Sequence, residues 1–175
     1  MSGFRGDVSA AGHRPPLRNR PRWVAVGREV ASHQSCEADT QKSMSQHNIE
    51  LHRRGAEAAN AREVPVDLLA PGFRMENRVT AVTDNAYRGA EGWREWMSDL
   101  FDVFAEGARY EVEEIIAAGD DFVVAMLCVA GRGARSGLPI TFRWAGVTWF
   151  RGNKAVRAVG YPTREQALEA VGLHE

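Results

Sequence analysis

The sequence is poor in features that would each point to a particular class of protein. Only two of its 175 residues are cysteines, Cys36 and Cys128. Neither has a metal-ligand spacing, so we expect no disulfide framework and no metal site, and a reduced cytoplasmic setting fits better. No run of about 18 apolar residues occurs, so no segment is predicted to span a membrane.

Basic charge is scarce in most of the chain. The formal net charge is −1, but residues 1–43 hold seven Lys or Arg against four Asp or Glu, a net of +3. Residues 44–175 hold fifteen against nineteen, a net of −4. An acidic domain without a basic patch argues against nucleic-acid binding as the main role.

Residues 1–43 also differ from the rest in composition. They are rich in Arg, Pro, Gly and Ser and show no sustained periodicity, which is typical of disordered segments. We therefore predict a disordered basic N-terminal extension at 1–43 and a single domain at 44–175, for which Met44 would make a natural start. A basic arm or targeting segment is the alternative interpretation of the extension.

The most regular pattern lies between Leu138 and Tyr161. Aromatic and β-branched residues recur there with period two, which predicts a strand with two different faces. A turn at Gly152-Asn153 leads into a second alternating run, so the two runs form an antiparallel hairpin. The side expected to face inward carries Phe142, Trp144, Gly146, Thr148 and Phe150, and the opposite side carries Thr141, Arg143, Ala145, Val147 and Trp149.

Helices and further strands are predicted around this hairpin. The expected order is helix 45–62, short helix 64–69, strand 73–80, helix 89–104, strands 109–117 and 122–131, the hairpin, and helix 163–171. Helices beside antiparallel strands make an α+β layer domain. A curved antiparallel sheet wrapped around helices leaves a cone-shaped cavity, which is a natural small-molecule site.

Three local motifs give this order a family resemblance. They are YRGAEGWREW at residues 87–96, FRGNKAVR at 150–157 and YPTREQALEAVGL at 161–173. Together they resemble the SnoaL-like group of the nuclear transport factor 2-like superfamily, which includes ketosteroid isomerases, limonene epoxide hydrolase and polyketide cyclases. The resemblance covers roughly residues 45–173. It implies a cone-shaped α+β barrel and, commonly, a homodimer through the outer sheet face, but it does not fix a reaction.

The acids that the resemblance implies for catalysis are missing from the matching positions. The carboxylate base of the ketosteroid isomerases falls on Asn77, and their aspartate and tyrosine donors fall on Gly146 and near Gly55. The aspartate that cyclases often carry after the last strand is replaced by Thr163. Arg143 or Arg157 can supply the arginine of the epoxide hydrolases, but two inward aspartates are not found.

A moderately polar pocket remains. We expect Asn77, Trp144, Thr148 and Tyr161 to bind the substrate through their amide, indole and hydroxyl groups. Glu114 follows Tyr110 and Val112 at alternating positions and is the candidate catalytic base if that side faces inward; otherwise it is a solvated edge carboxylate. Among the five histidines, only His52 is expected near the cavity. A lone histidine at such a position is more often a surface residue or a core residue with its hydrogen bonds satisfied.

Two functions from different classes follow from this pocket. The first is a cofactor-free isomerase, cyclase or hydrolase that acts on an apolar, ring-containing metabolite. The second is a non-catalytic module that binds such a ligand or forms a dimer. The stripe around Val147 and Trp149 on the outer face is expected to meet the second subunit.

Overall fold

The computed structural model describes residues 30–79 and 86–174, with side chains described from Met44 onward. Its elements are helix α1 (Val30–Ala61), strands β1 (Leu69–Asn77) and β2 (Ala86–Arg88), helix α2 (Gly89–Phe101), strands β3 (Arg109–Ala118), β4 (Phe122–Arg132), β5 (Pro139–Arg151) and β6 (Lys154–Tyr161), and helix α3 (Arg164–Glu169). None of the described helices is long and apolar enough to cross a membrane.

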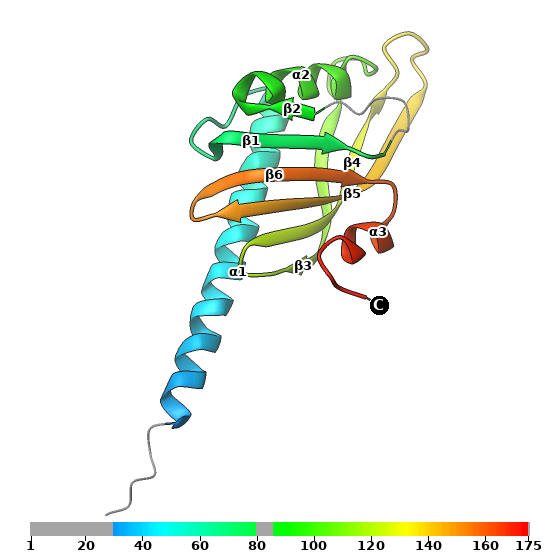
Figure 1. The fold of residues 1–175 in the computed structure, drawn as a ribbon. Coiled ribbons are helices and arrows are strands. Elements are labelled where there is room, and N and C mark those ends of the chain that lie inside the picture. The colour runs from blue at the N-terminus through cyan, green and yellow to red at the C-terminus, as the bar shows by residue number, and fades with distance from the viewer. Residues whose placement is uncertain (1–29, 80–85, 175) are drawn as a thin grey trace, which may run out of the picture.

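The strands form one bent sheet in the order β2-β1-β6-β5-β4-β3, which Figure 1 shows between the three helices. The predicted α+β class and the β5–β6 hairpin are confirmed. The sheet is mixed, because β1 pairs with β6 in parallel while the other neighbours are antiparallel. It also stays open, with β2 and β3 as its edges, so it is not a closed barrel.

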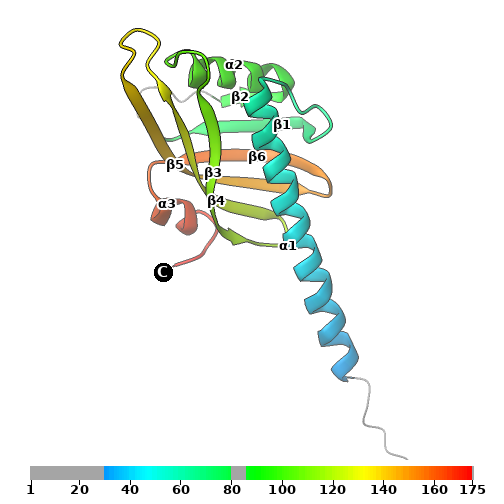
Figure 2. The same cartoon turned by 180° about the vertical axis from the view of Figure 1, so that it is seen from behind.

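The two faces of the sheet are covered by different helices. Helices α1 and α2 pack against the inner, concave face, as Figure 2 shows from behind. The large apolar cluster of this inner side includes Leu51, Phe73, Trp93, Val129 and Trp144. Helix α3 packs against β4, β5 and β6 on the outer face, where a second, smaller cluster forms.

Several predicted boundaries are wrong. Helix α1 begins at Val30, well before residue 45, whereas residues 1–29 and 80–85 lie outside the described residues. Residues 30–43 of the predicted extension therefore belong to a helix, and disorder stays a prediction for residues 1–29. The predicted helix 64–69 is a single turn, in which the amides of Leu68 and Leu69 donate to the carbonyl of Pro65. It does not continue as a helix because strand β1 begins at Leu69.

Bulges change which side chains face the cavity. Strand β3 shifts register against β4 between Val112 and Glu114, and again between Ile115 and Ala117. Strand β5 shifts against β6 between Trp149 and Phe150. An extra residue at a bulge moves the following side chains to the opposite face. Period-two counting across these points therefore assigns residues to the wrong side.

The outer face is not an open apolar stripe. Thr163 caps α3 by accepting a hydrogen bond from the Gln166 amide at 3.3 Å, as predicted. Leu168 of that helix joins Ala145 and Val147 in the outer cluster, and Val147 has no exposed surface. Val147 therefore has no surface left for a second subunit, because the outer cluster on the C-terminal helix side of the sheet already covers it. The expected contact through Trp149 stays a prediction.

The end of α1 is fixed to the sheet and to α2 by polar contacts. The amide of Asn60 donates to the Tyr110 carbonyl at 2.7 Å and accepts from the Tyr110 amide at 2.8 Å. Arg62 adopts the left-handed φ of 60° that ends the helix. Its guanidinium donates to the Ala108 carbonyl at 3.1 Å and lies 3.2 Å from the centre of the Phe101 ring. These contacts set the distance between the helix and the sheet.

We predict that Asn60→Ala lowers the free energy of unfolding by about 2 kcal/mol, because it removes both hydrogen bonds to Tyr110 and leaves their backbone partners without the amide. Urea denaturation followed by circular dichroism measures this change. Asn153→Ala is the matched control, since it removes only an exposed contact to His47, and we expect less than about 0.5 kcal/mol for it. Equal effects of the two substitutions would mean that the hydrogen bonds between Asn60 and Tyr110 contribute little to stability.

Candidate functional site

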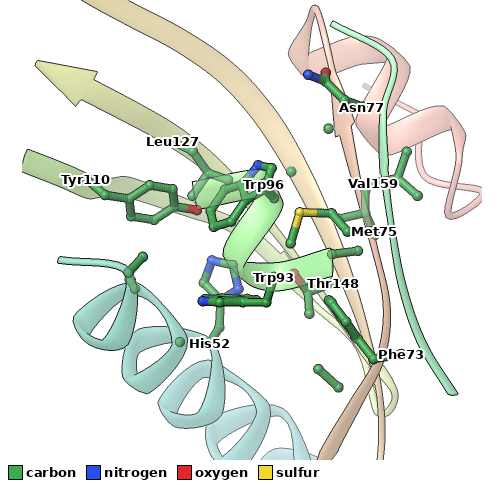
Figure 3. Close-up of a pocket in the computed structure, with 18 of the residues that line it drawn as sticks. His52, Phe73, Met75, Asn77, Trp93, Trp96, Tyr110, Leu127, Thr148 and Val159 are labelled. Carbon is green, nitrogen blue, oxygen red and sulfur yellow. The ribbon is translucent and has the colours of Figure 1, made fainter. Parts of the chain in front are cut away.

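A cavity of about 110 Å³ lies between α1, α2 and the inner face of the sheet. Figure 3 shows that its walls come from elements far apart in the sequence. Its surface is mostly apolar, and aromatic rings from Phe73, Trp93, Trp96, Tyr110, Phe142 and Trp144 form part of it. The cavity predicted from the fold is therefore present.

The aromatic rings form a continuous chain along the cavity wall. Trp93 and Trp96 of α2 lie 5.1 Å apart between ring centres, and Trp96 meets Tyr110 of β3 edge-to-face at 6.0 Å. Tyr110 in turn lies 5.7 Å from Trp144, which is 5.2 Å from Phe142. Tilted and edge-to-face pairs at these distances are favourable, so the wall is preformed and offers flat surfaces to a ligand.

His52 is the most unusual polar residue of the site. Its ring points from α1 into the cavity (Figure 3), and its Nε2 is buried without a hydrogen-bond partner among the described residues. Burial, assisted by the charge of the neighbouring Arg53, lowers the pKa of His52 from 6.5 to about 4. The imidazole is therefore neutral at pH 7, and one of its nitrogens lacks a partner.

Tyr110 contributes the second buried polar group. Burial raises the pKa of its phenol well above the ordinary value, so the hydroxyl keeps its proton at neutral pH. The described residues provide no hydrogen-bond partner for this hydroxyl, whereas the Tyr110 backbone is held by Asn60. It can donate to a ligand or accept from one.

Three of the predicted site residues line the cavity: Asn77, Trp144 and Thr148. Trp144 is buried, and Thr148 is half-buried on the same strand. Asn77 ends β1, and its Oδ1 accepts the backbone amide of Val79 at 2.9 Å. Part of its hydrogen-bonding capacity therefore holds the chain after β1. Whether any of the three binds a substrate stays a prediction.

Tyr161 does not line this cavity. Its side chain belongs to the outer cluster, and the Arg78 guanidinium lies 5.6 Å from its ring centre. Ala158 and Gly160 of β6 line the cavity instead. Period-two counting places Tyr161 on the same side as Ala155. In the structure Ala155 packs in the inner cluster and Tyr161 in the outer one, because β6 changes side at its register shift.

Glu114 also lies outside the cavity. Its carboxylate is 55% exposed and is 3.9 Å from the Arg164 guanidinium at the start of α3, on the outer face. The bulge after Val112 separates it from the inward side of Tyr110 and Val112. A role as base at the cavity has no geometric support, and the alternative of a solvated edge carboxylate fits.

The acidic residue at the edge of the cavity is Glu76, and its carboxylate already forms ion pairs with arginines. Although partial burial opposes ionisation, Arg157, Arg78 and Arg74 hold the pKa of the Glu76 carboxyl below its ordinary value. Its carboxylate oxygens lie 3.1 to 3.3 Å from nitrogens of these arginines. No group of three His, Cys, Asp or Glu residues within the described part of the chain is placed to hold a metal ion.

Comparison with known proteins assigns this architecture to a family. The model of the SnoaL-like domain matches residues 52–158, which span both sides of the cavity. The chain belongs to the SnoaL-like family. A search of curated proteins found no match.

Several solved structures share the SnoaL-like fold at low sequence identity. A protein of ketosteroid isomerase-like fold from Catenulispora acidiphila, in complex with trimethylamine, is 19% identical (TM-score 0.53), and the match covers 71% of this chain and 93% of the other. A candidate polyketide cyclase from Acidithiobacillus ferrooxidans is 15% identical (TM-score 0.55), with 71% and 93% covered. TerC, co-crystallised with polyporic acid, is 18% identical (TM-score 0.54), with 65% and 89% covered. These likenesses show the fold alone.

The sequence predicts no more for His52 than the ordinary role of a lone histidine. Its unpaired nitrogen can be recognised only when the surrounding walls are in place. The same holds for Tyr110, for which the sequence predicts only a position on one side of a strand. The signal that was available is the helical spacing of His52 with Ala56 and Ala59, all of which line the cavity.

We predict that His52 makes stability depend on pH. Because its folded pKa of about 4 is below the unfolded value of 6.5, the unfolded state binds a proton more readily between these values, and stability falls as the pH is lowered through this window. The loss amounts to about 3 kcal/mol between pH 7 and pH 4. Urea denaturation across this pH range measures the free energy of unfolding of wild type and of His52→Leu. The difference between their pH dependences gives the contribution of His52.

His47→Leu is the control, since it changes an exposed histidine of the same helix and should keep the wild-type dependence. If wild type and His52→Leu lose stability in parallel below pH 6.5, His52 is not buried in its neutral form.

Proposed function

We propose that the chain binds a small, apolar, ring-containing molecule in the cavity between α1, α2 and the sheet. The observation that carries this proposal is the aromatic wall of the cavity, which is built from Trp93, Trp96, Tyr110, Phe142 and Trp144. Ligand sites are typically concave and mostly apolar with a few polar groups. Two of the similar structures, a candidate polyketide cyclase and TerC with polyporic acid, fit a ring-containing ligand.

The size of the cavity limits the ligand. Its volume of about 110 Å³ is somewhat less than the roughly 150 Å³ of an apolar protein cavity that admits benzene. It is well below the roughly 300 Å³ at the lower end of drug-binding pockets. A single six-membered ring is therefore the largest core that this conformation supports.

Binding is better supported than catalysis. Within the described residues, the one carboxylate at the cavity edge, Glu76, is paired with arginines outside it. His52 is neutral, but a pKa of about 4 makes it a weak base at pH 7. A cofactor-free isomerase, cyclase or hydrolase is the second candidate, favoured by the protonated Tyr110 hydroxyl, which can donate to a developing oxyanion. A cytoplasmic location is part of the proposal and rests on the scarcity of cysteine.

We predict that filling the cavity abolishes binding. Ala56 lines the cavity from α1, so Ala56→Leu places a larger apolar side chain in the space that the ligand needs. Toluene should quench or shift the tryptophan fluorescence of wild type, because Trp93, Trp96 and Trp144 line the site, and should bind Ala56→Leu at least about tenfold more weakly.

Ala61→Leu is the matched control, since it makes the same chemical change at an exposed position of α1 and should bind toluene like wild type. Equal binding to Ala56→Leu and wild type would show that toluene binds elsewhere. If wild type binds no single-ring compound, the proposal is wrong.

Dimer formation is a proposal as well. Trp149 is half-buried on the outer face, with the Arg157 guanidinium 5.0 Å from its ring centre. We propose a homodimer through this part of the face, beside the area that α3 covers. Trp149 is the apolar contact there, since large aromatic side chains are enriched at interfaces.

Trp149→Glu should convert the dimer to a monomer in sedimentation analysis. The new carboxylate can pair with Arg157, so the fold is expected to survive while the apolar contact is lost. Val103→Glu, at an exposed apolar residue after α2, is the control and should remain dimeric. A wild-type monomer, or a dimer that persists in Trp149→Glu, would contradict this interface.

A further inference from the structure

His52 carries more information about the ligand than the aromatic wall does. Its Nε2 is buried in the cavity wall and has no hydrogen-bond partner within the described part of the chain. Buried polar atoms of native proteins nearly always have a partner, and an exception calls for an explanation. A ligand that brings a hydrogen-bonding group to this position supplies the missing partner.

The other polar groups of the cavity are less available. The indole N–H of Trp93 donates to the Glu63 carbonyl at 3.0 Å, and the Oδ1 of Asn77 accepts from the Val79 amide. Both are therefore engaged in holding the protein's own structure. Tyr110 has its hydroxyl free of described partners, so it is the competitor of His52 for the polar end of a ligand.

The charge of the cavity selects against ionic ligands. The imidazole of His52 is neutral, the phenol of Tyr110 is protonated, and the Glu76 carboxylate is paired with arginines on the outer face. A carboxylate or ammonium ligand would enter a low-dielectric space without a counter-charge among the described lining residues, which is strongly unfavourable. A quaternary ammonium can be stabilised by aromatic faces, so the experiment includes one.

A hydroxyl group suits His52 better than a carbonyl. In the neutral imidazole one nitrogen donates and the other accepts, and which one carries the proton depends on the tautomer. A hydroxyl donates to an unprotonated Nε2 and accepts from a protonated one, whereas a carbonyl can only accept. A hydroxyl therefore satisfies the orphaned nitrogen in either tautomer.

We propose that His52 is the polar anchor of the site and that the ligand is a neutral single-ring compound with one hydroxyl, a phenol or cyclic alcohol, whose oxygen hydrogen-bonds to Nε2. This inference rests on the proposed binding function and narrows it to one ligand class. The ring lies against the aromatic wall of α2, β3 and β5, and the hydroxyl turns toward α1.

Phenol and toluene test the anchor, because they share ring and size and differ in a hydroxyl against a methyl group. The dissociation constants of both are measured by tryptophan fluorescence for wild type, His52→Leu, Tyr110→Phe and His47→Leu. The quantity of interest is the ratio of phenol to toluene affinity. We expect it to fall roughly three- to tenfold in His52→Leu, to fall less in Tyr110→Phe, and to stay near the wild-type value in the exposed control His47→Leu.

Each other outcome overturns a distinct statement. A ratio that falls in Tyr110→Phe but not in His52→Leu makes Tyr110 the anchor. An unchanged ratio in all variants removes the polar anchor while the proposed apolar binding stands. Tighter binding of tetramethylammonium than of phenol overturns the neutral class, and binding of neither phenol nor toluene to wild type overturns the proposed function itself.

Nitrogen-15 NMR of the histidine ring provides a readout that a purely structural role would not move. Phenol should shift the Nε2 resonance of His52 in wild type, and toluene at equal saturation should shift it much less. Equal shifts with both ligands would overturn the hydrogen bond. This measurement needs no substitution, so it remains decisive if His52→Leu folds poorly.

Discussion

The structure depends first on how the end of α1 is held against the sheet. Asn60 forms two hydrogen bonds with the backbone of Tyr110, and Arg62 bonds the Ala108 carbonyl while it stacks on Phe101. Trp93 ties α2 to the same segment through the Glu63 carbonyl. These contacts are directional, so they fix helix, helix and sheet at a set spacing. Apolar packing alone would allow the layers to collapse onto each other and close the cavity.

The cavity between these layers is unusual in the protonation states of its polar groups. In a catalytic site, buried acids and bases are commonly tuned toward neutral pH by nearby charges. Here burial alone dominates, and it moves His52 and Tyr110 in opposite directions, each toward its uncharged form. The site is therefore built to recognise a polar group and less to transfer a proton. This balance, more than the absence of any one acid, favours binding over turnover.

Much of the fold could be predicted from the sequence. Period-two alternation located β4, β5 and β6, and the inward side of Trp144 and Thr148 was correct because β5 is regular through that stretch. Alternation alone leaves the side of Glu114 open and places Tyr161 in the pocket, whereas register shifts after Val112 and Trp149 put both side chains outside the cavity. A bulge depends on pairing between strands, and no local pattern in one strand reveals it.

Two other features also required the tertiary structure. The covering of Val147 by α3 depends on where the C-terminal helix folds back, which the capping residue Thr163 does not determine. The importance of His52 depends on the absence of a partner, and such an absence can be recognised only when every neighbour is in place. Residue type alone could not separate this histidine from a satisfied one.

The cavity offers a ligand no unpaired charge among the described lining residues, because Glu76 is paired with arginines and His52 and Tyr110 are uncharged. A neutral ligand forms no ion pair there, so its affinity should vary little with ionic strength. Near neutral pH its binding should also release or take up no protons, because His52 and Tyr110 keep their protonation states. Occupancy of the site would then follow the concentration of the ligand itself and remain insensitive to fluctuations in salt.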